Sequence, residues 1–428
     1  MKKRNLLVFL VIIMGFSIVL SSCDEGENGG GNVSVKDLAG EYDEDITVEG
    51  KDVTLTGKVV IKDGATMTIK AGTVITADAS DLSYLLVEQG GKIEAIGTES
   101  DPIIFTANAL EAGAWGGLHL CGKASINSGS TGLSEIGDAP YGGTDDSDNS
   151  GTLKYVRVEY SGTTLDATHE ANGISFYGVG SGTTVDYVEI YIGQDDGIEF
   201  FGGTVNIKHA IVYGAGDDSY DWTQGWRGKG QYLIAIQTPG GDRGFEGDNL
   251  GSNNEATPFA NPMLSQITLI GDNEGDDYGM KLREGTKGKI RNFIVTKFDK
   301  RSIHVEHNQT ILNVNDGSLT VDFGKVNDQV SDKPIKYSVS KIQADTDVDG
   351  DGDVDEDDEI KDPSAPELDE TKKFALSTNV EVADFSAATA STTYTGGTDM
   401  SSVDAFFVSD TEIGAGTDWA TAWSKAIN

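Results

Sequence analysis

Short apolar runs alternate with clusters of Gly, Asn and Asp along most of the chain. From Val53 the sequence reads VTLTGKVVIKDGATMTIKAGTVITA, in which Val, Ile and Thr alternate with polar residues. Such alternation is typical of half-buried β-strands, and the Gly-rich breaks are typical of the turns between them. No segment between residues 171 and 301 has helical periodicity. The pattern predicts an all-β fold.

One short phrase returns through the middle of the chain. Clear copies begin at Asp195 (DDGIEF), Asp217 (DDSYDW), Asp242 (DRGFEG) and Asp276 (DDYGMK), and degenerate copies begin at Ala171 (ANGISF) and Lys300 (KRSIHV). The steps between copies run from 22 to 34 residues, a period that indicates a solenoid with one copy per coil. We therefore expect a right-handed parallel β-helix of about ten coils between residues 53 and 330.

Stacking of these coils places equivalent residues about 4.8 Å apart, so the acidic phrases should form columns. The first column holds Asp195, Asp217, Asp242 and Asp276, the second Asp196, Asp218, Arg243 and Asp277, and the third Glu199, Asp221 and Glu246. Two carboxylates at that distance repel by about 3 to 4 kcal/mol at an effective dielectric of 20. The columns need a cation, a basic neighbour or shared protons, which favours a binding groove. The alternative is turn chemistry, because Asp stabilises turns by bonding its own backbone.

The candidate site joins these acids to aromatic and basic neighbours. The expected ligand-binding residues are Asp195, Asp196, Glu199, Asp217, Asp218, Asp221, Trp222, Trp226, Asp242, Arg243 and Glu246; for an enzyme, the candidate catalytic residues are Asp195, Asp217, Asp218, Arg243, Lys281 and Arg283. In the enzyme, carboxylates would hold calcium or act as acid and base, and a basic side chain would remove a proton or bind a sugar carboxylate. Recurrence of acids in successive coils favours binding, because a catalytic centre needs a unique set of unlike groups.

The first 22 residues predict an export signal, with Met-Lys-Lys-Arg followed by an apolar run from Leu6 to Leu20. The ending LSSC resembles a bacterial lipobox, which implies that Cys23 is acylated, for example by palmitate. Residues 23–33 are acidic and Gly-rich, as expected of a flexible tether, and they resemble the surface-export signal of Bacteroidota lipoproteins. We expect a lipid-anchored outer-membrane protein exposed at the cell surface.

Charge narrows the choice of partners. The formal net charge is −38, and removal of Lys2, Lys3 and Arg4 with the signal leaves 29 basic against 70 acidic residues, or −41. Nucleic acids and anionic surfaces are poor partners for such a chain. Once Cys23 is acylated, Cys121 is the remaining cysteine, so we expect no intramolecular disulfide.

Several motifs carry a family resemblance. They include IKAGTVI, PIIFTA, AWGGLHLCGKASIN, DNSGTLKYVRVEYSG, NGISFYGVGSGTTVDYVEIY and DDGIEFFGGTVNIKHAIV, together with the closing pattern IGA..DW..AW from Ile413 to Trp423. The chain resembles right-handed parallel β-helix lipoproteins of Bacteroidota over nearly all of its mature length. The resemblance implies the fold and the cell-surface setting, and it supplies little function. β-Helices of the pectate-lyase and polygalacturonase type place their sites on a strand face.

A second acidic region follows the repeats. The segment DVDGDGDVDEDD, residues 347–358, places oxygen ligands and Gly352 at the positions of an EF-hand-type calcium loop. The candidate ligands are Asp347, Asp349, Asp351, Asp353, Asp355 and Asp358. The loop resembles that of dockerin modules, but dockerins pair two loops and we find one, which argues against a cohesin partner. Calcium is the expected cofactor, and the alternative is an acidic solvated linker.

The predicted organisation is a signal peptide (1–22), a tether (23–33), a β-helix (34–337) with a loop excursion (122–150), an acidic calcium-loop segment (338–369) and a C-terminal cap (370–428). A cap is expected because the last coil of a solenoid presents unpaired strand edges. We expect a non-catalytic surface lipoprotein that binds calcium and a glycan or a protein. The alternatives are a polysaccharide lyase or glycoside hydrolase acting on acidic polysaccharide, and a structural lipoprotein without a small ligand.

Overall fold

A computed structural model describes residues 33–164, 170–273, 278–327, 334–343, 359–374, 376–378 and 390–427. Several predictions concern positions outside these ranges: the export signal, Cys23 and the tether to residue 32, Asp276 and Asp277 of the repeat, and the calcium loop 347–358. They stay predictions.

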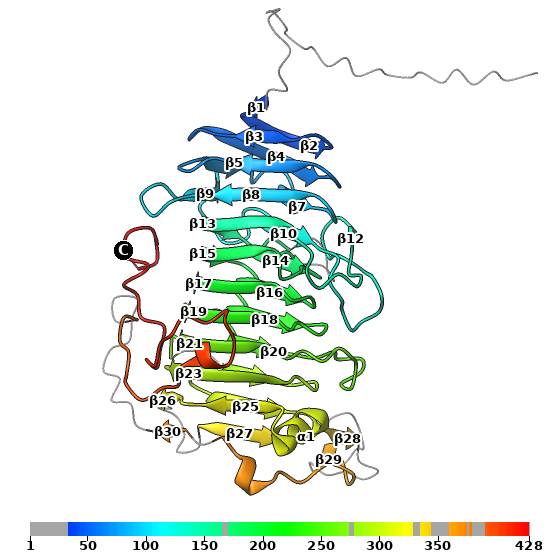
Figure 1. The fold of residues 1–428 in the computed structure, drawn as a ribbon, viewed down its shortest axis with the longest axis vertical. Helices are drawn as coiled ribbons and strands as arrows, with labels where there is room; N and C mark the ends of the chain where they lie inside the picture. Colours follow the sequence, from blue (N-terminus) through cyan, green and yellow to red (C-terminus); the bar gives the residue numbers. More distant parts are fainter. Residues whose placement is uncertain are drawn as a thin grey trace, which may run out of the picture. The chain divides into compact units, whose positions relative to one another are not determined.

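The described chain forms a right-handed parallel β-helix, as the repeat predicts (Figure 1). Its main sheet contains 26 described strands, and every pairing between the described strands of this sheet is parallel. Each coil contributes three strand segments, which stack on equivalent segments of the neighbouring coils and so form three faces. Long strands bend at a corner and supply the first two faces, because their two halves pair with different partners.

The first face contains β1 (Val33–Val35), β3 (Ile46–Val48), β5 (Thr66–Ile69), β8 (Lys92–Ile96), the first halves of β13 (Gly151–Ser161), β15 (Thr184–Gly193), β17 (Asn206–Tyr213), β19 (Lys229–Ile236), β21 (Met263–Ile270) and β23 (Gly288–Thr296), and β25 (Leu319–Asp322). The second face contains the first halves of β2 (Asp37–Tyr42) and β4 (Val53–Ile61), then β6 (Val74–Ala77), β9 (Ile103–Ala107), the second halves of the long strands, β26 (Lys325–Asn327) and β30 (Ser377–Thr378). The first strand begins at Val33, next to the predicted start of the β-helix at residue 34 and about 20 residues before position 53, from which coils were expected.

The third face carries the acidic phrases. It runs through the second halves of β2 and β4, then β7 (Tyr84–Val87), β10 (Leu118–Cys121), β14 (Ile174–Tyr177), β16 (Ile198–Phe201), β18 (Tyr220–Thr223), β20 (Arg243–Gly247), β22 (Tyr278–Leu282), β24 (Arg301–Glu306) and β27 (Ile335–Ser338). Both degenerate copies of the repeat are confirmed as coils, since β14 pairs with β16 and β24 pairs with β22. Large apolar side chains such as Phe176, Phe200, Trp222 and Phe245 point inward and form the core.

One helix interrupts the coils, which the sequence pattern did not predict. Helix α1 (Asn308–Asp316) follows His307 and ends at Gly317, whose φ of 80° is the left-handed conformation that glycine adopts readily. The helix buries Ile311 and Val314 in the main core. Its short NQTILNVND sequence has only one apolar stripe, which is too little signal to separate it from a strand.

The excursion 122–150 leaves the coil and then packs back over the third face. It contains a small antiparallel pair, β11 (Gly132–Leu133) and β12 (Pro140–Tyr141). Buried Ile126 and Tyr141 join Tyr177 and Phe201 in an apolar cluster that is separate from the interior of the solenoid. The excursion therefore forms a wall beside the acidic phrases (Figure 1).

The C-terminal region caps the last coils, as the sequence predicted, and it also packs along the side of the solenoid, which the sequence did not predict. Near the last coils, β28 (Lys341–Gln343) pairs with β29 (Glu359–Lys361), η1 (Glu370–Lys372) follows, and Phe374 packs against the main core, as expected of a cap. Residues 390–427, which include η3 (Met400–Ser402), instead run along the corner between the first two faces (Figure 1). We call residues 390–427 the C-terminal segment. No helix among the described residues is long and apolar enough to cross a membrane.

Candidate functional site

The strand register confirms the third predicted column. Glu199 in β16 pairs with Asp221 in β18, which pairs with Glu246 in β20. Neighbouring positions on a strand point to opposite faces, and the residues after the first two acids, Phe200 and Trp222, lie in the core. The three acids therefore project outward from adjacent coils.

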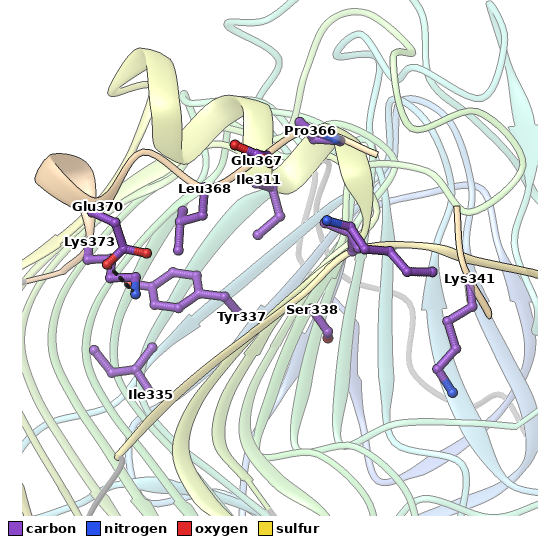
Figure 2. A pocket seen from close by; sticks show the side chains of 12 residues that line it. Ile311, Ile335, Tyr337, Ser338, Lys341, Pro366, Glu367, Leu368, Glu370 and Lys373 are labelled. Atoms are coloured by element: carbon purple, nitrogen blue, oxygen red, sulfur yellow. Dashed lines mark ion pairs between the residues drawn. The ribbon is translucent and has the colours of Figure 1, made fainter. Parts of the chain in front are cut away.

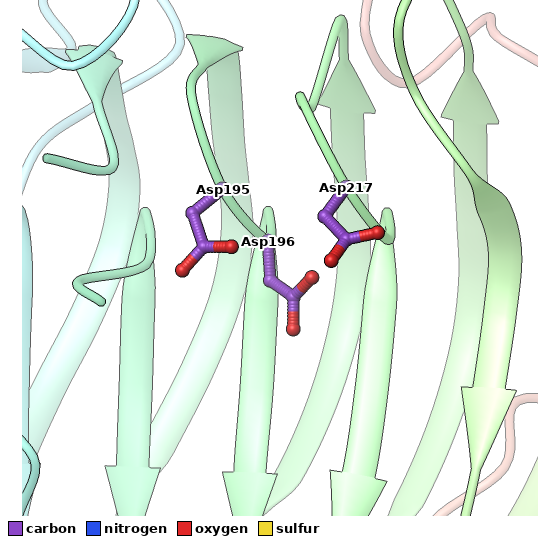
Figure 3. Close-up of side chains that lie close together, drawn as sticks. All are labelled: Asp195, Asp196 and Asp217. Atoms are coloured by element: carbon purple, nitrogen blue, oxygen red, sulfur yellow. The ribbon is translucent and has the colours of Figure 1, made fainter. Parts of the chain in front are cut away.

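The first and second columns lie at the corner that precedes this face. The amide of Asp242 donates to the carbonyl of Asp217 at 3.0 Å, and the amide of Asp218 donates to Asp196 Oδ1 at 2.8 Å. Side-chain oxygens of Asp195, Asp196 and Asp217 lie within 4.8 Å of one another, and Figure 3 shows their carboxylates gathered at adjacent coils. Stacking thus brings together side chains that lie more than 20 positions apart in the sequence.

Two further trios meet the same distance limit, and one pocket joins most of these acids. The trios are Asp196, Glu199 and Asp221, and Asp217, Asp218 and Asp242. A cavity of about 160 Å³ lies among them. It is lined by Glu135, Glu170, Asn172, Asp195, Asp196, Glu199, Asp217, Asp218, Asp221 and Glu246. We call this cavity the acidic pocket.

Burial changes the protonation of the acidic pocket. Burial raises the pKa of Asp195 to about 7, and the carboxylates of Glu170 and Asp217 add to the shift. Burial and neighbouring carboxylates raise the pKa values of Asp196, Glu199, Asp218 and Asp221 well above their ordinary values. Each group is disfavoured as an anion because it leaves water and faces like charge. A bound cation would reverse this preference.

Basic side chains neutralise only one end of the acidic pocket. Arg243 lies 3.2 Å from Asp218, 2.6 Å from Asp242 and 3.0 Å from Glu246. Arg283 contacts Glu246 at 2.5 Å and Asp248 at 2.9 Å.

The other end has no such partner. Among the described residues, no ion pair forms on Asp195, Asp196, Glu199, Asp217 or Asp221. Oδ1 of Asp221 is buried, and none of the described residues forms a hydrogen bond with it.

The outward column changes sign after Glu246. Its next members are Lys281, His304 and Lys336, in register on successive coils. Lys281 lies 3.6 Å from Glu306 and does not line the acidic pocket. Of the candidate catalytic residues, the pocket therefore brings together the three aspartates, with Arg243 and Arg283 beside them, and it leaves Lys281 outside.

The prediction that Trp222 and Trp226 bind ligand is wrong. Both rings are buried in the interior of the solenoid, where Trp226 stacks on Phe200 with a centroid distance of 4.0 Å. Trp222 Nε1 donates to the Thr286 hydroxyl at 3.1 Å, which satisfies its polar group inside the core. Trp222 follows Asp221 directly, so the two side chains must point to opposite sides of the strand.

Three pocket residues were not among the predicted ones. Asn172 occupies the position of Asp196 in the degenerate copy ANGISF, and its amide donates to Glu199 at 2.6 Å. Repeat alignment could have found it. Glu135 comes from the excursion 122–150, and Glu170 follows a part of the chain outside the repeat. No periodic signal points to these two acids.

A larger cavity lies at the C-terminal end of the solenoid. Its volume is about 760 Å³, and its walls combine apolar side chains such as Ile311, Ile335 and Leu368 with charged ones such as Lys341 and Glu370 (Figure 2). An ion pair of 2.6 Å between Lys373 and Glu370 lies at its edge. It shares no lining residue with the acidic pocket.

Comparison with known families supplies the identity of the scaffold. The profile of the pectate-lyase-like β-helix domain matches residues 40–427. The chain belongs to this family. Comparisons with curated proteins and with solved structures found no match. For this pectate-lyase-like β-helix protein, family membership explains the coils, and the function has to be argued from the acidic pocket.

Proposed function

We propose that the protein is a non-catalytic, calcium-binding β-helix protein whose third face binds a glycan or a protein at the cell surface. One observation carries the proposal: three trios of carboxylates have oxygens within 4.8 Å of one another. Calcium takes six to eight oxygen ligands at about 2.3 to 2.6 Å, so oxygens around one ion lie up to about 5 Å apart. The donors of the acidic pocket are carboxylates and one amide, which suits this ion.

The volume of the acidic pocket is suited to an ion that keeps part of its hydration shell. A cavity of about 160 Å³ holds about five waters at ~30 Å³ each. Calcium bound by Asp195, Asp196 and Asp217 would therefore retain open positions. A carboxylate or a pair of hydroxyls from a ligand could fill them, which is how calcium would join an anionic face to an anionic glycan or protein.

The basic side chains favour binding over lyase chemistry. A lyase needs a base that can lose its proton. Although burial opposes it, Asp218, Glu246 and Asp242 raise the pKa of Arg243, and Asp248 and Glu246 do the same for Arg283. Both guanidinium groups are thus held in the charged form and occupied by ion pairs.

A hydrolase is the second candidate, and one observation favours it. The pKa of Asp195 is raised to about 7 beside Asp217, and a carboxylic acid that keeps its proton near neutral pH can act as a general acid. We rank it second because the acids recur in three coils. Incubation with acidic polysaccharides, followed by assay of reducing ends and unsaturated uronides, tests it; turnover lost in Asp195→Asn would replace the first proposal.

Anchoring and the second calcium loop belong to the same proposal. Cys23 would carry the lipid that holds the protein in the outer membrane, and residues 347–358 would bind one calcium from a contiguous segment. The described strands β28 and β29 flank this segment and pair with each other at residues 341–343 and 359–361. Such pairing brings the ends of the segment together, as a local ion-binding loop requires.

Calorimetry with calcium tests the proposal. The protein should first carry Asp347→Asn with Asp351→Asn, so that the loop 347–358 is silenced. We expect this protein to bind calcium, and to bind members of a glycan and surface-protein panel with calcium but not with chelator. Absence of calcium binding would refute the assignment of the acidic pocket. Calcium binding without any panel ligand would limit the protein to a structural role.

A further inference from the structure

The corner between the first two faces carries an unusual column of side chains. Its members are Tyr155, Tyr187, His209, Tyr232, Gln266 and Asn292, all with φ between 49° and 61°. Residues other than glycine adopt this conformation rarely, and here it turns each side chain out of the strand ladder at the bend. Ring centroids of Tyr155 and Tyr187 lie 4.3 Å apart, and those of Tyr187 and His209 lie 4.2 Å apart. We call this column, together with Arg157, Glu159, Glu189, Tyr191 and Gln231 beside it, the flank groove.

Amide side chains in the flank groove bind the backbone of the C-terminal segment. Gln231 Nε2 donates to the Val408 carbonyl at 3.0 Å, and the Val408 amide donates back to Gln231 Oε1 at 2.8 Å. Asn292 makes the same pair of bonds with Thr398, at 2.7 and 2.8 Å. Paired contacts of this kind recognise an extended peptide through its main chain, as a strand added to a sheet is recognised.

Two tryptophans anchor the end of the segment on the aromatic part of the groove. Trp419 packs against His209 with a centroid distance of 5.1 Å. Trp423 meets Tyr155 and Tyr187 edge-on, at 5.9 and 6.2 Å. Edge-to-face contacts at these distances are favourable and depend on ring orientation, so this part of the groove selects aromatic side chains.

Buried carboxylates then hold the last residues. Glu189 is fully buried and accepts the amides of Lys425, at 2.9 and 3.0 Å, and of Ala426, at 2.9 Å. Glu159, only 5% exposed, contacts the Lys425 ammonium at 2.9 Å and Arg157 Nε at 3.0 Å. The Lys425 ammonium also lies 4.3 Å from the ring centroid of Tyr191. Buried charges need such partners, so the groove favours a cation at this position.

The packing of the segment is separate from that of the solenoid. Ala390, Ile413, Ala420 and Trp423 form an apolar cluster with outward-facing isoleucines of the second face, including Ile234. The interior of the coils is a different cluster, to which none of these residues belongs. The segment therefore packs on the outside of the solenoid and contributes no residue to its interior core.

We propose that the flank groove is a peptide-recognition site for the sequence W-x-x-x-W-x-K, here Trp419, Trp423 and Lys425, and that it accepts this segment from a second copy of the chain as well as from its own. A second copy supplies the identical backbone register, the two rings and the cation. Exchange of a terminal element between copies costs little, because the same contacts form in either case. The chain's own segment prevails in dilute protein, since tethering gives it a millimolar effective concentration. This proposal is independent of the acidic pocket.

Complementation between two full-length variants tests the proposal. One, Trp423→Ala with Lys425→Ala, has a weakened segment and an intact groove. The other, Glu159→Lys with Glu189→Ala, has an intact segment and a weakened groove. We expect each alone to be monomeric at micromolar concentration and an equimolar mixture to contain a one-to-one complex, measured by light scattering and native mass spectrometry. A mixture that stays monomeric would overturn the exchange.

A labelled synthetic peptide of residues 415–428 provides the second measurement. We expect it to bind the weakened-segment variant at least ten-fold more tightly than the unmodified chain, whose own segment competes, while a scrambled peptide does not bind. Equal binding of both peptides would overturn the recognition of W-x-x-x-W-x-K. Loss of the β-structure signal in circular dichroism, in this variant and in the milder Lys425→Ala, would show that the segment is part of the core and would also overturn the proposal.

Discussion

Removing two charges from the acidic pocket should stabilise the calcium-free protein. We consider Asp195→Asn with Asp217→Asn, which keeps shape and removes two carboxylates whose oxygens lie within 4.8 Å. At that distance and an effective dielectric of 20, two anions repel by about 3 kcal/mol. The unit Val33–Asn428 has an unfolding entropy of about 0.8 kcal/mol/K at about 2.1 cal/mol/K per residue. The melting temperature at pH 8 should therefore rise by about 4 °C.

Calcium should close most of the difference in melting temperature between the two proteins. At one hundred times its dissociation constant, a ligand of the folded state contributes about 2.7 kcal/mol, which corresponds to about 3 °C for a chain of this length. We expect this rise in the unmodified pocket and none in the Asn variant. Both proteins carry Asp347→Asn with Asp351→Asn, so that the loop 347–358 does not contribute. The readout is calorimetric melting with calcium and with chelator.

A matched control separates the pocket from overall charge. Glu44→Gln with Glu49→Gln also removes two negative charges, at exposed positions on either side of β3, near the N-terminal end of the solenoid. This control should melt within about 1 °C of the unmodified chain, because surface substitutions rarely exceed ±0.5 kcal/mol, and it should keep the calcium response. The reasoning is refuted if the pocket variant is less stable than the unmodified chain without calcium, or if it still responds to calcium.

Three further outcomes are expected. Without calcium, the free energy of unfolding should fall as pH rises from about 5 to 8. The reason is that Asp195, with a pKa of about 7, and Asp248, with a pKa of about 6, hold protons in the folded chain that the unfolded chain releases. Saturating calcium should flatten this slope, and a melting temperature that rises with pH would contradict the prediction. Trp222→Ala should lower the free energy of unfolding by about 3 to 5 kcal/mol by leaving a core cavity, and calorimetry should show an unchanged calcium affinity. Weaker calcium binding would show that Trp222 contributes to the site. Cys23→Ala should abolish lipid labelling and release the protein from membranes, and its retention there would argue against the lipid anchor.

The columns could be predicted because a parallel coil repeats its geometry. Once the phrase was aligned, residues at the same position had to stack one strand spacing apart, and the pairing of Glu199 with Asp221 and of Asp221 with Glu246 confirms this. The error over Trp222 came from treating neighbours in sequence as neighbours in space. Alternation along a strand already separates Asp221 from Trp222, so the sequence held the information.

Other features had no local signal. The C-terminal segment has little regular structure, and its contacts join residues far apart, such as Lys425 to Glu189 and Thr398 to Asn292. The rings that contact the C-terminal segment lie at equivalent positions of successive coils. Their exposure depends on a positive φ, which the residue types at these positions do not predict. Glu135 likewise reaches the acidic pocket only through the fold of the excursion 122–150.

The placement of the acids also favours a cation site over turn chemistry. Asp196 does act as a turn residue, since its side chain accepts the amide of Asp218 at 2.8 Å. The third column has no such task, because Glu199 and Asp221 lie within strands β16 and β18, where the backbone is already paired on both sides. The second column shows that the corner does not require an acid either. Arg243 takes the position of Asp218 in the next coil, and it pairs with three carboxylates. Among the described residues, Asp195, Asp196 and Asp217 in the two preceding coils have no ion pair, although the scaffold accepts a neutralising arginine one coil later. Such a cluster of anions loses stability unless a cation joins it, and this is the strongest argument for calcium in the acidic pocket.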